Sequence, residues 1–438
     1  MGTADVIIVG TGAAGLFHAL KLPPELNILI ITKDEAENSD SFLAQGGMCV
    51  MRGEGDYDSY FEDTMHAGHY ENDKAAVDVM IRTSPHIVDE LVDYGVDFRR
   101  NPDGSFAYTR EGAHSEYRIL FHDDLTGREI TSKLLERAME RDNITVMEYT
   151  TMVDILCDET ENRVGGVVVR NSDGTYEAIR SRCVVLATGG MGGLFRFSTN
   201  FPHITGDALA IALRHGIEVE HIDYIQIHPT SLYSERPGRR FLISESVRGE
   251  GALLYNAAGE RFVNELLPRD VVARKILEQM HKDGRPYVEL DIRHLGKDGI
   301  RRRFPNIYKR CLEEGYDMAT QRIPVTPAQH YFMGGIKVDL DSKTTMDGLY
   351  AVGETSCNGV HGRNRLASNS LLESLVFAER AADHIKTHIP ADIPLADHIF
   401  DVNPEQYAHI EEVYRKTVLE EIKRKDKEFY EEWFESES

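Results

Sequence analysis

The sequence predicts an α/β protein that begins with a Rossmann-like nucleotide-binding unit. Two observations carry this prediction. Residues 6–10 (VIIVG) form a short apolar run typical of a buried strand, and residues 11–22 (TGAAGLFHALKL) are typical of a helix. Far downstream, residues 183–190 (CVVLATGG) form another apolar strand, which ends in small residues.

Three glycines join the first strand to the first helix. Gly10, Gly12 and Gly15 have G-x-G-x-x-G spacing. In this motif the first glycine permits a tight turn, the second lets the backbone approach a pyrophosphate, and the third packs the helix on the strand. The phosphates then lie at the helix N-terminus, so Ala13 and Ala14 belong to the expected site. The alternative is an ordinary glycine turn, and the position between a strand and a helix favours the nucleotide site.

The next strand indicates which nucleotide is bound. Residues 26–32 (LNILIIT) end in Thr32-Lys33-Asp34, where a NAD-binding unit usually has an acidic residue for the ribose. The displaced acid argues against NAD, and the Ala-Thr-Gly-Gly ending at 187–190 is typical of FAD-binding folds. Between these strands we expect a helix at 129–141 and a hairpin with an Asp-Gly turn within 163–179.

Composition excludes several classes of protein. The 438 residues include 49 Lys+Arg and 73 Asp+Glu, a net charge of −24, which disfavours a nucleic-acid partner. No segment approaches the roughly 18 apolar residues of a membrane-spanning helix, and we expect no signal peptide. The five cysteines are scattered without a C-x-x-C pair, which predicts no metal site and suits a reducing cytoplasm: Cys49, Cys157, Cys183, Cys311 and Cys357.

Further motifs resemble a known family. In order along residues 5 to about 385, they are similar to those of the succinate dehydrogenase/fumarate reductase flavoproteins. The motifs are SFLAQGGMCV (41–50), TGDALAIALRHG (205–216), QIHPT (226–230), RGEGALLYNAAGERFV (248–263), PRDVVARKI (268–276), PAQHYFMGGIKVD (327–339) and GLYAVGETSCNGVHGRNRLASNSLLESL (348–375).

The resemblance implies an architecture. It predicts a Rossmann-like FAD-binding domain split between 1–221 and 331–385. An α+β capping domain at 222–330 is inserted into it, and closure of this domain excludes water from the flavin. A short C-terminal helical segment follows at 386–438. Dehydrogenases of the family link the flavin to a histidine, but that position here is Asp40, so FAD is expected to be non-covalent.

The resemblance also implies FAD contacts. A helix starting at Leu371 is expected to point its N-terminus at the flavin, where its positive dipole end stabilises negative charge. Ser368-Asn369-Ser370 are expected to cap this helix, and Glu354 to contact the ribityl chain. The full set expected to bind the cofactor, besides the residues of the glycine motif, is Lys33, Ser41, Ala44, Gln45, Gly46, Gly47, Asp207, Glu354, Ser370 and Leu371.

A dicarboxylate substrate is implied as well. Its carboxylates need fixed cations and hydrogen-bond donors, and His228, His330 and Arg365 are expected to hold them. Arg269 matches the proton-transfer arginine of the family, although a guanidinium rarely gives up a proton. Gln226 lies two residues before His228 and therefore on the same strand face. Further substrate contacts are expected from Ser244, Glu245 and Ser368.

One segment separates the branches of the family. Residues 109–130 (TREGAHSEYRILFHDDLTGREI) are similar to the branch that oxidises L-aspartate, and Glu111 is expected to bind the substrate ammonium. The resemblance therefore implies a cytoplasmic enzyme that oxidises L-aspartate to iminoaspartate with O2 or fumarate as acceptor. Its product would pass to quinolinate synthase for NAD synthesis. The alternatives are a soluble fumarate reductase and a non-catalytic or RNA-modifying FAD protein.

Each candidate also has a purely structural interpretation. His66 and His69 in HAGHY, together with His114, have metal-like spacing without acidic or cysteine partners, so we expect them to be structural. The structural alternatives for the others are a satisfied core histidine (His228), a pair with Asp270 or a helix cap (Arg269), packing on Tyr331 (His330), turn chemistry (Ser244) and an exposed loop charge (Glu111).

Overall fold

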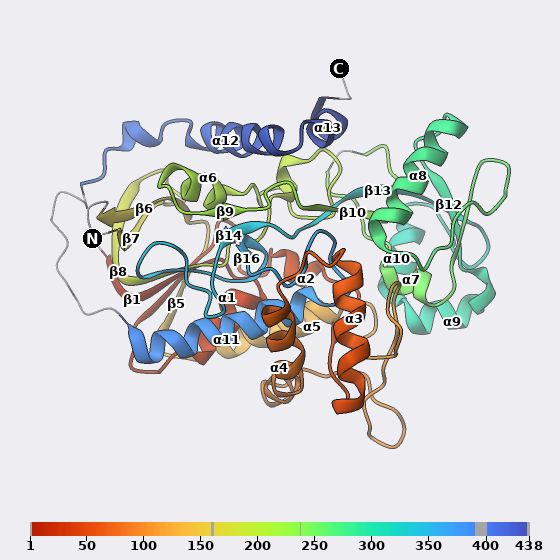
Figure 1. Ribbon diagram of the computed structural model, residues 1–438, viewed down its shortest axis with the longest axis horizontal. Coiled ribbons are helices and arrows are strands. Elements are labelled where there is room, and N and C mark those ends of the chain that lie inside the picture. Colours follow the sequence, from red (N-terminus) through yellow and green to blue (C-terminus); the bar gives the residue numbers. More distant parts are fainter. Residues whose placement is uncertain (1, 159–161, 237, 390–400, 436–438) are drawn as a thin grey trace.

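A seven-stranded sheet forms the centre of the molecule (Figure 1). The computed structural model describes residues 2–158, 162–236, 238–389 and 401–435. The strand order is β5-β2-β1-β8-β7-β6, with β15 also paired to β8. β5, β2, β1, β8 and β15 run parallel to one another. β7 is antiparallel to both of its neighbours, β8 and β6. The strands are β1 (Gly2–Val9), β2 (Ile28–Ile31), β5 (Ile144–Met147), β6 (Thr151–Asp158), β7 (Arg163–Arg170), β8 (Tyr176–Leu186) and β15 (Leu349–Ala351).

The sheet is buried on both faces, because successive side chains along a strand point into two different cores. In β1, Val6 and Ile8 belong to one core, whereas Ile7 and Val9 belong to the other. Helices cover both faces, as expected for a parallel sheet, and Figure 1 shows the two layers. The first core contains α1 (Ala13–Lys21), α4 (Lys74–Asp93), α5 (Thr126–Met139) and α11 (Ser370–His388), and the second contains α6 (Asp207–Arg214) and α12 (Ile410–Lys425).

A second α+β unit has its own sheet and core. Its strand order is β10-β13-β12-β11, and Val272, Ile276 and Ile300 contribute to its apolar core. The expected boundaries at 222 and 330 stay a prediction, and β13 runs across residue 330. The elements are β10 (Ile225–Leu232), β11 (Leu253–Tyr255), β12 (Val288–Asp291), β13 (Ile323–Phe332), α7 (Glu245–Gly249), α8 (Arg269–Asp283), α9 (Gly296–Arg303) and α10 (Pro305–Glu313).

Short elements connect these units. Two small sheets have the orders β16-β14-β9 and β3-β4. Within the described ranges, no helix is both long enough and apolar enough to cross a membrane. The remaining helices and strands are α2 (Asp40–Leu43), β3 (Met48–Cys49), α3 (Tyr57–Ala67), β4 (Ile119–Leu120), β9 (Val219–Glu220), β14 (Gly335–Lys337), β16 (Ser356–Cys357) and α13 (Lys427–Tyr430).

The expected local elements are largely confirmed. The first strand and helix, the helix at 129–141 and the β7–β8 hairpin are all present, and Gly174 in the hairpin turn has φ +84°. The described part of the C-terminal segment contains the helices α12 and α13, and Tyr414 and Val418 of α12 pack into the core beside α6. Residues 390–400 and 436–438 of that predicted segment lie outside the described residues.

Candidate active site

A cavity lies between the two units. Gly10 follows β1 and Thr188 follows β8, so the cavity begins at the carboxyl ends of the parallel strands. It continues to His228 on β10 and His330 on β13. Ligands of open α/β sheets bind at these strand ends.

The glycine motif forms one end of the cavity. Gly10 has φ +117°, and a Cβ there would lie 2.1 Å from the carbonyl oxygen of Ala187. Gly12 lines the cavity as the N-cap of α1 and contributes no side-chain cap. Gly15 and Ala13 lie behind this surface: a Cβ on Gly15 would be 2.2 Å from Gly10 O, and Ala13 N donates to Ser41 Oγ at 3.0 Å. The first turn of α1 therefore faces the cavity, as a pyrophosphate site requires.

The segment 41–47 forms the adjacent wall. Ser41, Ala44, Gln45, Gly46 and Gly47 all line the cavity. A Cβ on Gly47 would lie 2.3 Å from Leu120 O, so the backbone here admits no side chain. Gln45 Oε1 is buried without a hydrogen-bond partner among the described residues, which leaves an acceptor open to a ligand.

Lys33 and Asp207 form an ion pair on the cavity wall. Lys33 Nζ also donates to Thr205 Oγ1 and to His203 O, each at 3.1 Å. Asp207 is the first residue of α6 and accepts from Thr205 Oγ1 at 2.7 Å. Their position is compatible with the expected contact to FAD, which stays a prediction.

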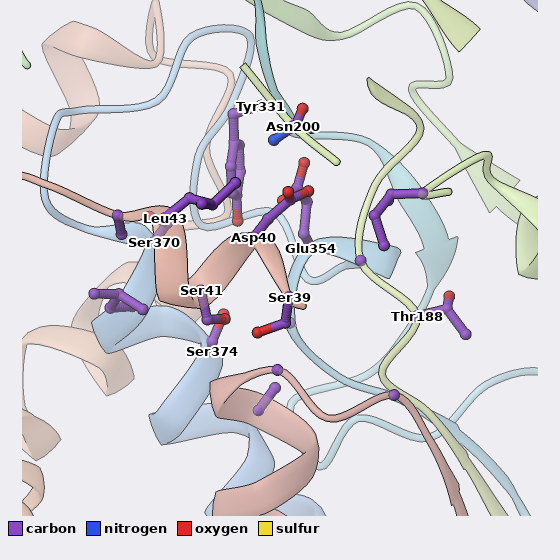
Figure 2. A pocket seen from close by; sticks show the side chains of 18 of the residues that line it. Ser39, Asp40, Ser41, Leu43, Thr188, Asn200, Tyr331, Glu354, Ser370 and Ser374 are labelled. Carbon is purple, nitrogen blue, oxygen red and sulfur yellow. The ribbon is translucent and has the colours of Figure 1, made fainter. Parts of the chain in front are cut away.

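Two acids, Asp40 and Glu354, line the cavity (Figure 2). Asp40 Oδ1 accepts from Phe201 N at 2.8 Å, and Oδ2 has no partner among the described residues. Glu354 Oε1 accepts from Phe332 N at 3.0 Å. Burial raises the pKa of Asp40 to about 7 and the pKa of Glu354 to about 8. Both carboxyls are therefore able to hold a proton near neutral pH.

His228 presents a donor to the cavity. Its Nδ1 accepts a hydrogen bond from Thr230 N at 3.1 Å, so the neutral ring carries its proton on Nε2. Nε2 is buried and has no hydrogen-bond partner among the described residues. Burial, followed by the charge of Arg269, holds the pKa of His228 well below its ordinary value. The ring is thus a neutral donor, and the interpretation as a satisfied core histidine is not supported by its free Nε2.

His330 lies next to it. The two ring centroids are 5.0 Å apart, and His330 Nδ1 is 2.7 Å from Thr199 Oγ1. Burial, followed by the charges of Arg269 and Arg365, holds the pKa of His330 well below its ordinary value. Its main contacts are therefore with Thr199 and His228 rather than with Tyr331.

Arg365 is a buried cation with an unused donor. Its Nη1 donates to Ser370 Oγ at 2.5 Å, and its guanidinium lies 4.1 Å from the centre of the Tyr331 ring. Nε has no hydrogen-bond partner among the described residues. Burial lowers the pKa of Arg365 to about 10, so the group remains charged at neutral pH. A buried charge with a free donor is suited to bind a carboxylate.

Arg269 is held from two sides at the start of α8. Its Nε donates to Glu245 Oε2 at 2.9 Å, and Nη1 donates to Gln226 Oε1 at 2.8 Å. Glu245 also binds Arg248, which donates to Glu265 O at 2.7 Å. The alternative in which Arg269 only pairs with Asp270 is not supported, because its guanidinium donates to Glu245 and Gln226 instead. Asp270 pairs with His69 at 3.0 Å.

Gln226 is a supporting residue. It does not line the cavity, but its Nε2 donates to Arg365 O at 2.9 Å while its Oε1 accepts from Arg269. One amide thus connects both arginines. We infer that its expected substrate contact is indirect, through the positions of the two guanidinium groups.

Glu111 is buried, with 3% of its surface exposed, so the exposed-loop interpretation is wrong. Its Oε1 accepts from Ser246 Oγ at 2.5 Å and its Oε2 from Ser368 Oγ at 2.6 Å. Ser244 lines the cavity and also accepts from Ser246 N at 3.2 Å as the N-cap of α7. Turn chemistry and a place in the site therefore coexist at Ser244.

Comparisons with known proteins identify the family. A family model described as "FAD binding domain" matches residues 5–371. An L-aspartate oxidase of Clostridium perfringens is 51% identical over 387 residues, which cover 88% of this chain and 87% of that protein. The chain belongs to the L-aspartate oxidase family. An L-aspartate oxidase of Clostridium acetobutylicum is 47% identical, with 88% of both chains covered.

Solved structures place this family among the fumarate reductase flavoproteins. A quinol fumarate reductase of E. coli superposes with a TM-score of 0.85 at 32% identity, covering 94% of this chain and 74% of that one. FAD is the cofactor, and the predicted fold class is confirmed. The glycine corner and the open acceptor on Gln45 fit this cofactor.

The predicted cap of α11 is wrong. The helix begins at Ser370, and its N-cap Asn369 makes no side-chain capping bond. Asn369 Oδ1 instead accepts from Tyr60 at 2.8 Å. The hydroxyls of Ser368 and Ser370 are turned to Glu111 and Arg365. These serines support the substrate end of the cavity instead of closing the helix.

Sequence reasoning missed several residues of the site. Ser246 and Arg248 lie within or next to a quoted motif, so their positions were available. Thr199, Asn200 and Arg239 come from irregular segments without any local pattern. The cavity residues outside the predicted set include Thr188, Thr199, Asn200, Arg239, Tyr331 and Ser374.

Another group of ionisable side chains lies away from the cavity. His86, Glu90 and Glu379 have a spacing that suits a metal ion. Lys21 Nζ, however, lies 3.0 Å from Glu90 and 2.8 Å from Glu379, so an ammonium already neutralises these carboxylates. His114 is buried against Ala367 O at 2.9 Å, in keeping with a structural role.

Proposed function

We propose that this chain oxidises L-aspartate to iminoaspartate. The observation that carries the proposal is a carboxylate, Glu111, held in the same buried cavity as the cations Arg269 and Arg365. A plain dicarboxylate needs cations and donors only, whereas an amino dicarboxylate also presents an ammonium group. Both Clostridium relatives described above are named L-aspartate oxidase, which agrees with this chemistry.

Bound FAD supplies the two-electron acceptor for the hydrogen on the substrate Cα. The chain supplies the orientation. His228 Nε2–H, His330 and the free Nε of Arg365 are positioned to bind the substrate carboxylates. Charge-assisted bonds of this kind fix both ends of a dicarboxylate and place its Cα.

Glu111 faces the remaining group of the substrate. Its two oxygens accept from serine hydroxyls, which hold it as an acceptor able to attract an ammonium. Arg269 is fixed by Glu245 and Gln226 and stabilises negative charge on the substrate. The contact between Arg269 and Glu245 keeps that guanidinium oriented before the substrate arrives.

The wider role rests on chemistry and on the family. We propose O2 or fumarate as the acceptor that reoxidises the flavin, non-covalent FAD, and transfer of the unstable imine to quinolinate synthase for NAD synthesis. We also propose a cytoplasmic location, because the five unpaired cysteines suit a reducing compartment. The net charge of −24 supports the absence of a nucleic-acid partner.

Anaerobic reduction of the flavin tests the proposal. L-Aspartate should bleach the flavin absorbance of the purified holoenzyme, whereas succinate and NADH should not. Bleaching by succinate at a similar rate would favour the alternative function, a soluble fumarate reductase. Bleaching by none of the three would overturn both assignments and leave a non-catalytic FAD protein.

A further inference from the structure

A cysteine, a histidine and an aspartate form a line on the outer part of the FAD-binding unit. His215 Nδ1 lies 3.4 Å from Cys157 Sγ, and its Nε2 lies 2.7 Å from Asp154 Oδ1. A nucleophile, a base and a group that orients the base define the arrangement used to activate a thiol. None of the three residues lines the FAD cavity.

Two elements place this cluster at a distance from the cavity. Met152 of β6 lines the cavity, and Cys157 follows five residues later, about 16 Å along the strand. Asp207 begins α6 at the cavity, and His215 is the C-cap at its other end, about 12 Å away. Figure 1 shows α6 lying next to β6.

The surroundings favour a charged imidazole. The hydrogen bond that His215 Nε2–H donates to Asp154, followed by the contact of Nδ1 with Cys157, raises the pKa of His215 to about 10. The C-terminal end of α6 carries negative partial charge, which also stabilises a cation there. Arg214, the last residue of α6, donates to the hydroxyl of Tyr414 on the neighbouring α12 at 3.3 Å. The imidazolium is thus directed at the thiol and the carboxylate.

Cys157 differs from the other cysteines. All five lie within the described ranges, and Cys157 alone is partly exposed. Burial raises the pKa of the four others, to about 12 for Cys311 and Cys357. A thiol is reactive when it is accessible and lies next to a positive group, and Cys157 meets both conditions.

We propose that Cys157, His215 and Asp154 form a reactive-thiol site that is oxidised by hydroperoxides. The Cys157 thiolate attacks the terminal oxygen of the hydroperoxide and the O–O bond breaks. The leaving alkoxide, or hydroxide when the oxidant is hydrogen peroxide, takes the proton of His215 to become an alcohol or water. Sulfur loses two electrons and becomes a sulfenic acid, while the peroxide is reduced. His215 and Asp154 are positioning residues, and the site is independent of the oxidation of aspartate.

Alkylation of the intact holoenzyme tests the ion pair. Limiting iodoacetamide at pH 7, followed by peptide mass spectrometry, should label Cys157 before the four other cysteines. The imidazolium 3.4 Å from Sγ stabilises the attacking thiolate, so removing it should slow labelling about tenfold. His215→Gln and Asp154→Asn should both have this effect, while Arg214→Gln, which removes a neighbouring cation, should not.

Retained flavin absorbance and an unchanged far-UV spectrum show that each variant is folded. If His215→Gln loses its flavin, the labelling rate of Asp154→Asn is the test of the proposal. Hydrogen peroxide followed by dimedone should give an adduct on Cys157, and Cys157→Ser should abolish it without altering aspartate oxidation. Equal labelling rates in wild type and Asp154→Asn, equal slowing by Arg214→Gln, or absence of the adduct would overturn the proposal. Because peroxide is added, these results do not depend on whether aspartate is the substrate.

Discussion

Replacing Glu111 by Gln removes one negative charge from the cavity and keeps its shape. Both carboxylate oxygens accept from serine hydroxyls, of Ser246 and Ser368. A hydroxyl can rotate to accept from the new amide, so the variant should stay folded and retain FAD. The change therefore isolates the charge that we assign to the substrate ammonium.

The size of the effect follows from the burial of Glu111. Two unit charges about 4 Å apart interact by about 4 kcal/mol at an effective dielectric constant of about 20. At about 1.4 kcal/mol per tenfold, the loss in kcat/KM for aspartate should be one to three decades. Reduction of fumarate involves no ammonium, so its kcat/KM should change little.

The assay measures kcat/KM for both reactions with the same preparations. Glu116→Gln is a matched control, because Glu116 lies in the same segment, is 51% exposed and pairs with Arg52 at the surface. It should leave both reactions unchanged. Equal losses in aspartate oxidation and fumarate reduction for Glu111→Gln would refute the selective role, and would mean that Glu111 supports the site as a whole.

Three further predictions concern the cofactor and the second end of the substrate. Arg365→Leu should cost on the order of 2 to 5 kcal/mol in kcat/KM. The control Arg363→Leu changes an arginine whose side chain is 58% exposed and should leave kcat/KM unchanged. Similar kinetics for both variants would reject the contact between Arg365 and a substrate carboxylate. Because Asp40 cannot link the flavin, acid precipitation should release all the FAD, and yellow pellets would contradict this. Burial raises the pKa of Glu354 from 4.5 in the unfolded chain to about 8 in the folded apoprotein. Between these two pH values the folded state binds one proton more than the unfolded state, so the free energy of unfolding falls as the pH rises. In urea titrations, the free energy of unfolding of Glu354→Gln should equal that of wild type at pH 4.5 and exceed it by on the order of 3 kcal/mol at pH 7. A difference that stays constant with pH would exclude the titration of Glu354 as the cause.

The sequence predicted the parts of the fold that local patterns encode. The glycine motif, the apolar strands and the Asp-Gly hairpin depend on short-range sterics, so their positions follow from spacing. The boundaries of the inserted unit depend on packing between distant segments. β13, for example, belongs to the second sheet and yet runs across residue 330, and no local signal marks that transition.

The residues of the site also fall into those that local motifs predict and those that only tertiary packing reveals. The basic residues were found because motifs contain them, but their partners were not. Thr199, which contacts His330, comes from an irregular segment 131 positions away in sequence. The expectation that Ser368 and Ser370 cap α11 agrees with the usual role of serine before a helix. Tertiary contacts with buried charges overrode that local preference.

The pairing of β15 with β8 has a consequence for biosynthesis. Val184 to Leu186 pair with β1 on one side and with Leu349 to Ala351 on the other. The ribosome adds roughly 5 to 20 residues per second. Since β15 follows β8 by about 165 residues, this apolar edge remains unpaired for roughly 10 to 30 s during synthesis. Leu371 of the flavin cavity emerges later still, so the nascent chain passes through a stage in which neither its central sheet nor its cofactor site is complete. We expect that interval to be when the chain most needs a chaperone.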